Sequence, residues 1–260
     1  TLTDPIIRAF WEKELPQTAG QTKGEMLPYL VSKIGRFIEN VMMRNIIGQE
    51  KSGFNFREVM DRKKILLVNL SKGQVGEINS NLLGLIVVSK LQMAALARAD
   101  LPAEQRHDFF LYIDEFQNFI TDSIATILSE ARKYKLNLVL GHQYIAQLVP
   151  KQGDTKVRDA VFGNVGTICA YRVGVDDAEL MAKQLAPIFN EYDVINVEKF
   201  TAYLRLLIDN TAARPFSMRA FPPPKGDVAI ADAIKQLARL KYGRDRALVE
   251  AEIIERSQLA

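Results

Sequence analysis

The chain has 260 residues, of which 48% are hydrophobic and 25% are charged. This length and composition suffice for one large α/β core with a small appendage, and they exclude a largely disordered chain. The formal net charge is +3, which excludes the strongly basic surface that would by itself predict nucleic-acid binding.

Cysteine and histidine are scarce, and this excludes two classes of site. Cys169 is the one cysteine, so no intrachain disulfide can form, and the chain fits a reducing compartment. Cys169 lies in an apolar run, where we expect a buried strand thiol. His107 and His142 lack partners at metal-ligand spacing, so we expect no zinc site. We also find no signal peptide and no apolar run near the roughly 20 residues that span a bilayer.

The N-terminal segment has helical periodicity. Apolar residues recur at helical spacing over residues 5–15 and 26–47, and Gly48 ends the second stretch. Residues 1–60 are therefore predicted to form an N-terminal helical segment.

Short apolar strands then alternate with helices, which predicts an α/β fold with a mostly parallel sheet flanked by helices. The expected strands cover residues 64–70, 109–113, 136–140 and 165–171, and the expected helices residues 79–99, 122–134 and 156–162.

The pattern changes after an expected helix at 177–185. Apolar and polar residues alternate from Phe200 to Ile208, which predicts a half-exposed antiparallel strand. A turn at Asp209-Asn210 and the segment 215–221 complete an antiparallel hairpin. The prolines at 222–224 predict a linker, and the amphipathic pattern beyond them predicts a C-terminal helical tail.

Two acids end the strand at 109–113. Asp114 and Glu115 would leave the sheet at its carboxyl edge, where ligands bind in open α/β sheets. This is the Walker B arrangement: Asp114 would hold Mg²⁺ through water, and Glu115 would polarise the water that attacks the γ-phosphate of ATP. The alternative is a strand followed by an acidic helix cap.

Two further residues are candidates because of where they fall beside the next strand. Gln143 follows strand 136–140 and could contact the γ-phosphate and the attacking water, although a lone glutamine there is more often a loop residue. Arg132 precedes that strand. It could act as an arginine finger for a neighbouring subunit, or it could simply be a solvated cation near a helix C-terminus.

A phosphate-binding loop is missing from the sequence. No G-x-x-x-x-G-K-[ST] occurs, and the glycine-lysine turns at 20–24 and 71–74 lack its spacing. We therefore expect a hydrolytic site to take this loop from an upstream part of the same polypeptide.

The ordered motifs resemble the TraG/TraD-type coupling ATPases of type IV secretion, which are grouped with the FtsK and HerA motors. The motifs are Arg44–Gln49, Phe54–Arg57, Lys64–Gly73, Ile113–Phe119 and Glu130–Tyr134. The resemblance extends from about residue 26 to the prolines at 222.

The resemblance implies a RecA-like P-loop NTPase core in a homo-hexameric ring, with ATP and Mg²⁺ at subunit interfaces and DNA in a central channel. It assigns the roles given above to Asp114, Glu115, Gln143 and Arg132. It implies that residues 1–60 end an all-helical lobe, that 61–221 form the downstream part of the ATPase core, and that 222–260 form a linker and tail.

The same resemblance suggests a relaxase or secretion-channel proteins as partners. It places the protein in the cytoplasm or at the inner face of the cytoplasmic membrane, with no membrane span in this chain. Three functions stay open at this point: a conjugative DNA pump, a HerA-type DNA-processing motor, and a recognition or assembly module that does not hydrolyse ATP.

Overall fold

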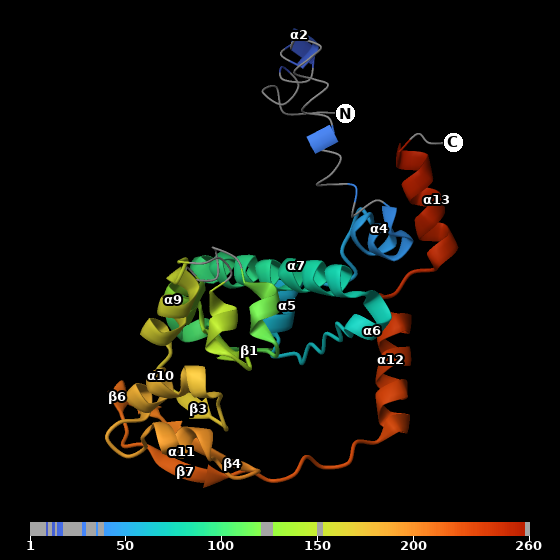
Figure 1. Ribbon diagram of the computed structural model, residues 1–260. Coiled ribbons are helices and arrows are strands. Elements are labelled where there is room, and N and C mark those ends of the chain that lie inside the picture. The colour runs from blue at the N-terminus through green and yellow to red at the C-terminus, as the bar shows by residue number, and fades with distance from the viewer. Residues whose placement is uncertain are drawn as a thin grey trace. The chain divides into compact units, whose positions relative to one another are not determined.

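The computed structural model describes residues 39–120, 127–149 and 153–257, together with a few isolated positions before residue 39. The chain divides into two compact units, one of residues 1–53 and 230–260 and one of residues 54–229 (Figure 1). The expected boundaries at residues 60 and 221 stay a prediction. The helices expected before residue 39 lie mostly outside the described residues; the isolated positions that are described there include α2 (Leu15–Gln17).

The larger unit is built on a parallel pair of strands. β1 (Phe109–Ile113) and β2 (Leu136–Leu140) pair in parallel, with Phe109 opposite Leu136 and Ile113 opposite Leu140. Both strands have the bounds that the sequence predicts. The α/β fold class is therefore confirmed.

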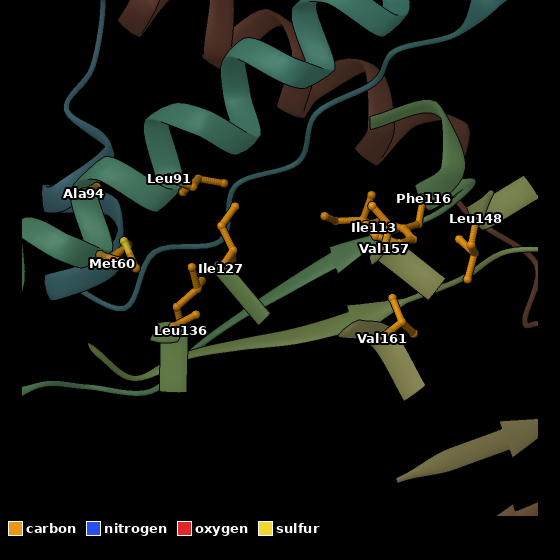
Figure 2. Packing of buried hydrophobic residues seen from close by; sticks show 12 residues of the cluster. Met60, Leu91, Ala94, Ile113, Phe116, Ile127, Leu136, Leu148, Val157 and Val161 are labelled. Carbon is orange, nitrogen blue, oxygen red and sulfur yellow. The ribbon is translucent and has the colours of Figure 1, made fainter. Parts of the chain in front are cut away.

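Helices cover one face of this pair, and several short turns connect them. α7 (Glu77–Leu96) contributes Leu91, Ala94 and Ala95 to a core that also holds Ile113 of β1 and Leu136 of β2 (Figure 2). The remaining elements of this region are α5 (Phe56–Asp61), α6 (Lys72–Val75), η2 (Ala97–Asp100), η3 (Ala103–Gln105), η4 (Phe116–Phe119), η5 (Ala131–Tyr134), η6 (Ile145–Leu148) and α9 (Lys156–Asn164). Residues 121–126 of the expected helix at 122–134 lie outside the described residues, and η5 forms its end.

The segment 64–70 corrects one expectation. It is extended but forms no strand ladder with any part of the chain that the structure describes. Ile65 and Leu67 are 88% and 76% exposed, so the predicted buried parallel strand is wrong here. The side chains of an extended segment are buried only where other elements cover its faces, and the described residues leave Ile65 and Leu67 largely uncovered. Ser80, which is buried, holds its end by donating from Oγ to the Leu70 carbonyl at 2.6 Å.

A second, antiparallel sheet follows. Its strands β3 (Ile168–Ala170), β4 (Thr201–Arg205) and β7 (Phe216–Arg219) lie in the order β3-β4-β7. The expectation that residues 165–171 continue the parallel sheet is wrong, because β3 pairs with β4 in the opposite direction. α10 (Val175–Leu185) and α11 (Glu191–Ile195) pack with this sheet around a second apolar cluster.

Cys169 lies on the open side of β3. Its neighbours in the strand are buried, while Cys169 itself is exposed. The expected buried thiol is therefore wrong, because alternation along a strand with one covered face turns this residue to the other face.

The predicted turn at Asp209-Asn210 connects a small hairpin of β5 (Leu207–Ile208) and β6 (Thr211–Ala212). Both turn residues have positive φ, 47° and 61°. The segment 215–221 pairs with β4 through β7 rather than with this hairpin.

The elements described in the smaller unit after residue 39 are helices. α4 (Val41–Ile47) packs with α13 (Arg246–Ser257), and Asn45 Nδ2 donates to Glu250 Oε1 at 2.9 Å. α12 (Val228–Tyr242) precedes α13. The predicted C-terminal helical tail is thus present as two helices.

One described helical stretch, Glu77–Asp100, is long and apolar enough by length and composition to cross a membrane. This differs from the expectation that no stretch approaches that length. Some of its residues, among them Leu91, Ala94 and Ala95, belong to the core that packs on β1 and β2.

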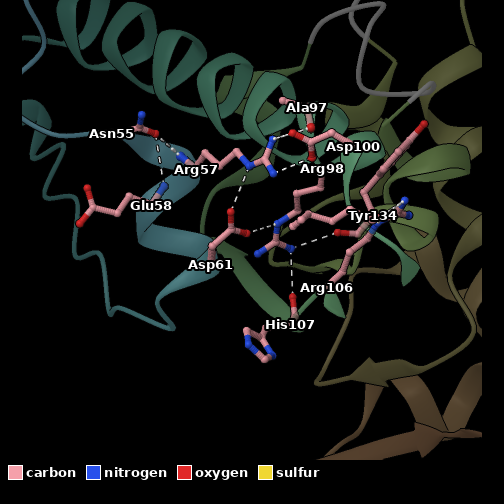
Figure 3. A network of polar contacts seen from close by, with 11 residues as sticks. Asn55, Arg57, Glu58, Asp61, Ala97, Arg98, Asp100, Arg106, His107 and Tyr134 are labelled. Carbon is pink, nitrogen blue, oxygen red and sulfur yellow. Dashed lines mark hydrogen bonds and ion pairs between the residues drawn. The ribbon is translucent and has the colours of Figure 1, made fainter. Parts of the chain in front are cut away.

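A buried arginine ties the larger unit together at the amino ends of its two parallel strands. Arg98 is 0% exposed, and its Nε donates to Asp61 Oδ1 at 2.9 Å. Its Nη1 donates to the carbonyls of His107, 2.9 Å away, and Tyr134, 3.1 Å away (Figure 3). His107 precedes β1 and Tyr134 precedes β2, so one guanidinium fixes both strand entrances. Arg57 completes the network through ion pairs with Asp61 and Asp100.

We expect Arg98→Met to destabilise the chain by about 3 kcal/mol, because it removes three hydrogen bonds that a fully buried guanidinium makes to half-buried Asp61 and to the carbonyls of His107 and Tyr134. Urea unfolding followed by circular dichroism measures this loss. Arg62→Met is the matched control: Arg62 pairs with Glu58 at the surface, and its loss should change the stability by less than about 0.5 kcal/mol. Equal losses of unfolding free energy in the two variants would show that the network around Arg98 stabilises the chain no more than a surface ion pair does.

Candidate functional site

The carboxyl ends of β1 and β2 meet in one small region. Asp114 and Glu115 follow β1, and Gly141 to Gln143 follow β2. Two backbone hydrogen bonds extend the ladder past the strands: Gly141 N donates to the Ile113 carbonyl, and Phe116 N donates to the Gly141 carbonyl, both at 2.9 Å. The parallel register therefore fixes where the polar residues beyond the strands lie.

Glu115 and Gln143 are in direct contact. Gln143 Nε2 donates to Glu115 Oε1 at 2.6 Å, and Gln117 Nε2 donates to Glu115 Oε2. The backbone of Glu115 is left-handed, with φ 50° and ψ 46°. For a residue other than glycine this conformation costs on the order of 1 kcal/mol, and such strain is concentrated at functional sites.

The hydrogen bonds keep Glu115 anionic. The pKa of the Glu115 carboxyl lies below its ordinary value. The hydrogen bond from the Gln117 amide is the largest cause, followed by the hydrogen bond from the Gln143 amide, and the charge of Lys72 lowers the pKa further. A carboxylate with a lowered pKa is a weak proton acceptor. In this arrangement Glu115 is therefore suited to orienting a water molecule and to stabilising positive charge on it.

Asp114 is exposed at the same edge. Its Oδ1 accepts from Glu115 N at 3.0 Å, and a Cβ added at Gly141 would lie 3.4 Å from that oxygen. Glycine at 141 thus leaves space beside the Asp114 carboxylate.

The donor set fits magnesium better than a metal held by protein ligands alone. Within residues 39–120, 127–149 and 153–257, no group of three or more His, Cys, Asp or Glu residues could hold a metal ion. Mg²⁺ usually takes one or two carboxylates and completes its shell with water and substrate phosphates. One exposed carboxylate beside an open edge matches that requirement.

Sequence reasoning missed a lysine near this edge. Lys72 Nζ lies 3.4 Å from Asn118 Oδ1 and 2.9 Å from Glu77 Oε1, and Asn118 N donates to the Glu115 carbonyl at 3.0 Å. The turn Ser71-Lys72-Gly73 was visible as a glycine-lysine turn, but nothing in its spacing shows that it lies beside Glu115. Gln117 was likewise visible only as part of the motif around the two acids.

Arg132 lies apart from these residues. It is part of η5, before β2 begins, and its Nη2 donates to Asn210 Oδ1 at 2.9 Å. The structure thus brings Asp114, Glu115 and Gln143 together and places Arg132 at the other end of β2.

Comparisons with known proteins give one family and several solved structures. The sequence model of the family described as "Type IV secretory system Conjugative DNA transfer" matches residues 13–191. No curated protein matches the chain. The plasmid coupling protein TrwB in complex with ADP and Mg²⁺ is similar with a TM-score of 0.47 and 16% identity, covering 60% of this chain and 38% of that one.

Two other structures of the same protein are similar. TrwB with the ATP analogue ADPNP has a TM-score of 0.45 and 16% identity over 55% of this chain and 38% of that one. The unbound monoclinic form of TrwBdeltaN70 has a TM-score of 0.42 and 17% identity, covering 52% of this chain and 35% of that one. The chain thus spans well under half the length of these structures.

The turn that carries Gln117 depends on a close contact at Gly84 of α7. A Cβ added at Gly84 would lie 2.0 Å from Cε1 of the Phe119 ring, which belongs to η4. Replacing glycine by alanine inside a helix normally stabilises it by about 1 kcal/mol. We expect the opposite sign here: Gly84→Ala should destabilise the chain by about 2 kcal/mol through overpacking.

Urea unfolding measures this effect, and Phe119→Leu in the same chain should recover part of it because the smaller side chain leaves room. Gly73→Ala is the control, because the nearest atom to its added Cβ is 4.0 Å away, and it should be neutral or stabilising. Strictly additive effects of the Gly84 and Phe119 substitutions would contradict the contact.

Proposed function

This chain belongs to the type IV secretory system conjugative DNA transfer family, and from that premise we propose that it is the downstream part of an ATP-driven DNA-pumping coupling protein. In this proposal the carboxyl edge of β1 and β2 is the hydrolytic half of the ATP site. The observation that carries the assignment is the contact between Glu115 and Gln143 at that edge.

An acidic pair and a glutamine at the ends of adjacent parallel strands suit phosphoryl transfer to water. Glu115 is anionic and orients the attacking water through its carboxylate. Gln143 can donate to a phosphate oxygen and accept from the same water once its amide leaves Glu115. Asp114 would hold Mg²⁺ through water, and the ion would neutralise charge on the phosphates.

A complete site also needs backbone amides around the phosphates. No G-x-x-x-x-G-K-[ST] occurs in the 260 residues, so in our proposal another part of the intact polypeptide supplies that loop. The length of TrwB beyond the region of similarity is in keeping with such a part. TrwB structures hold ADP with Mg²⁺ and ADPNP, and we propose ATP and Mg²⁺ for this protein also.

In our proposal Arg132 acts on a neighbouring subunit rather than on its own site. The whole of β2, five residues long, lies between Arg132 and Gln143. An extended strand advances about 3.3 Å per residue, so β2 alone separates the two residues by about 16 Å. An arginine at the amino end therefore does not reach phosphates at the carboxyl end of the same strand. A homo-hexameric ring with ATP at subunit interfaces would bring Arg132 to the next subunit's nucleotide.

The substrate follows from the family. We propose that the ring moves DNA through its central channel, and that a relaxase or secretion-channel proteins deliver and receive it. The protein would work in the cytoplasm or at the inner face of the cytoplasmic membrane. The family match favours this conjugative role over a HerA-type DNA-processing motor.

We expect Glu115→Gln in the intact polypeptide to keep ATP binding and to lower ATP hydrolysis by at least about 100-fold, because an amide cannot hold the water as a carboxylate does. Binding of a fluorescent ATP analogue and release of phosphate, each with and without DNA, measure the two effects. DNA should stimulate the parent. Hydrolysis by the variant at the parental rate would remove Glu115 from the mechanism, and a well-folded parent without hydrolysis would favour an assembly module.

A second prediction concerns Arg132. Arg132→Ala subunits and Glu115→Gln subunits should each be inactive, and mixing them should restore part of the hydrolysis, because intact Arg132 can then face an intact Glu115 across an interface. The rate is measured against the mixing ratio. If no mixture exceeds the single variants, Arg132 does not act between subunits.

A further inference from the structure

The backbone that carries Arg132 is fixed by two other arginines. Arg106 Nη1 donates to the Lys133 carbonyl at 2.7 Å, and its guanidinium lies 5.4 Å from the centre of the Tyr134 ring. Buried Arg98 donates to the Tyr134 carbonyl. The two residues that follow Arg132 are therefore held, so the freedom that remains lies in the Arg132 side chain.

Asn210 holds the far end of that side chain. It accepts from Arg132 Nη2 at 2.9 Å, although the two residues lie 78 positions apart in the chain. Asn210 is at the tip of the hairpin of β5 and β6, where it and Asp209 both have positive φ. Asparagine is one of the few residues other than glycine that adopts this conformation readily.

The hairpin itself is tightly attached to the body of the unit. A Cβ added at Gly166 would lie 2.3 Å from the Leu207 side chain, so β5 packs directly on the backbone there. Leu207 N donates to Thr167 Oγ1 at 3.1 Å, and Ala213 N donates to the Leu206 carbonyl at 2.8 Å. Asn210 is thus presented from a fixed position.

We propose that Asn210 is a positioning residue for Arg132: the hairpin tip orients the guanidinium so that it can enter the nucleotide site of the adjacent subunit. This inference rests on the proposed role of Arg132 between subunits. It adds a residue and an element, the hairpin of β5 and β6, to the machinery of that site.

The chemistry of the contact suits an arginine that must act elsewhere. A neutral amide oxygen fixes the direction of the guanidinium through one hydrogen bond and leaves its charge unneutralised. Within the described residues the structure gives Nε and Nη1 of Arg132 no partner, so both can donate to phosphate oxygens, which an arginine binds with two donors. A carboxylate in the same position would hold the guanidinium more strongly and would compete with the phosphates.

The test uses mixed rings in which only one kind of subunit supplies Arg132. Glu115→Gln subunits donate Arg132 to Arg132→Ala subunits, which supply the intact hydrolytic edge. Asn210→Gly is added first to the donor and then to the acceptor. Glycine tolerates the positive φ, so the turn is retained while the amide is lost. Asp209→Gly, at the other turn position, is the matched control.

We expect Asn210→Gly in the donor to lower the hydrolysis of the mixture by about tenfold, the size of one hydrogen bond to a charged group. In the acceptor it should have no effect, and Asp209→Gly should be silent in both. An effect of equal size in donor and acceptor would mean that the hairpin tip has a general structural role and would overturn the inference. An inactive starting mixture would reject the role of Arg132 between subunits and this inference with it.

A second readout is independent of hydrolysis. The guanidinium protons of Arg132, assigned by comparison with Arg132→Ala, should exchange more slowly in the parent chain than in Asn210→Gly as seen by NMR. Unchanged exchange would show that the contact with Asn210 does not hold Arg132, and would overturn the inference even if the mixed rings were active.

Discussion

The parallel pairing of β1 with β2 is the constraint on which the candidate site depends. Ile113 lies opposite Leu140, and the ladder continues through Gly141 into the turn that begins at Phe116. A shift of this register by one residue would reverse the faces of the side chains, and Glu115 and Gln143 would no longer meet. The contact between these two side chains therefore depends on the backbone pairing.

The opposite end of the same strands is held by a different kind of interaction. Arg98 is buried and binds the carbonyls that precede β1 and β2, so the strand entrances are fixed by charge-assisted hydrogen bonds within the core. The two ends then have separate tasks in our account. We propose that the carboxyl end carries the groups that orient water and metal, and that the amino end presents Arg132 to a neighbour, with Asn210 directing its guanidinium.

The sequence predicted what depends on local pattern. The apolar runs at 109–113 and 136–140 have the length of buried strands, and the polar residues after them had to lie at one edge once the strands were parallel. Features that depend on distant segments left no such pattern. They are the extended segment at 64–70, which joins no described sheet, the antiparallel direction of β3, and the positions of Lys72 and Asn210. Their places depend on tertiary contacts such as Ser80 with Leu70, which no periodicity records.

A structure of the intact polypeptide with Mg²⁺ and a non-hydrolysable ATP analogue would test whether the edge of β1 and β2 is the hydrolytic site. We predict that the terminal phosphate lies within hydrogen-bond distance of Gln143, that a water bound to Mg²⁺ contacts Asp114, and that Arg132 of an adjacent subunit approaches the phosphates. A nucleotide bound elsewhere, with the edge of β1 and β2 empty of phosphate and metal, would contradict the assignment of this edge as the hydrolytic site.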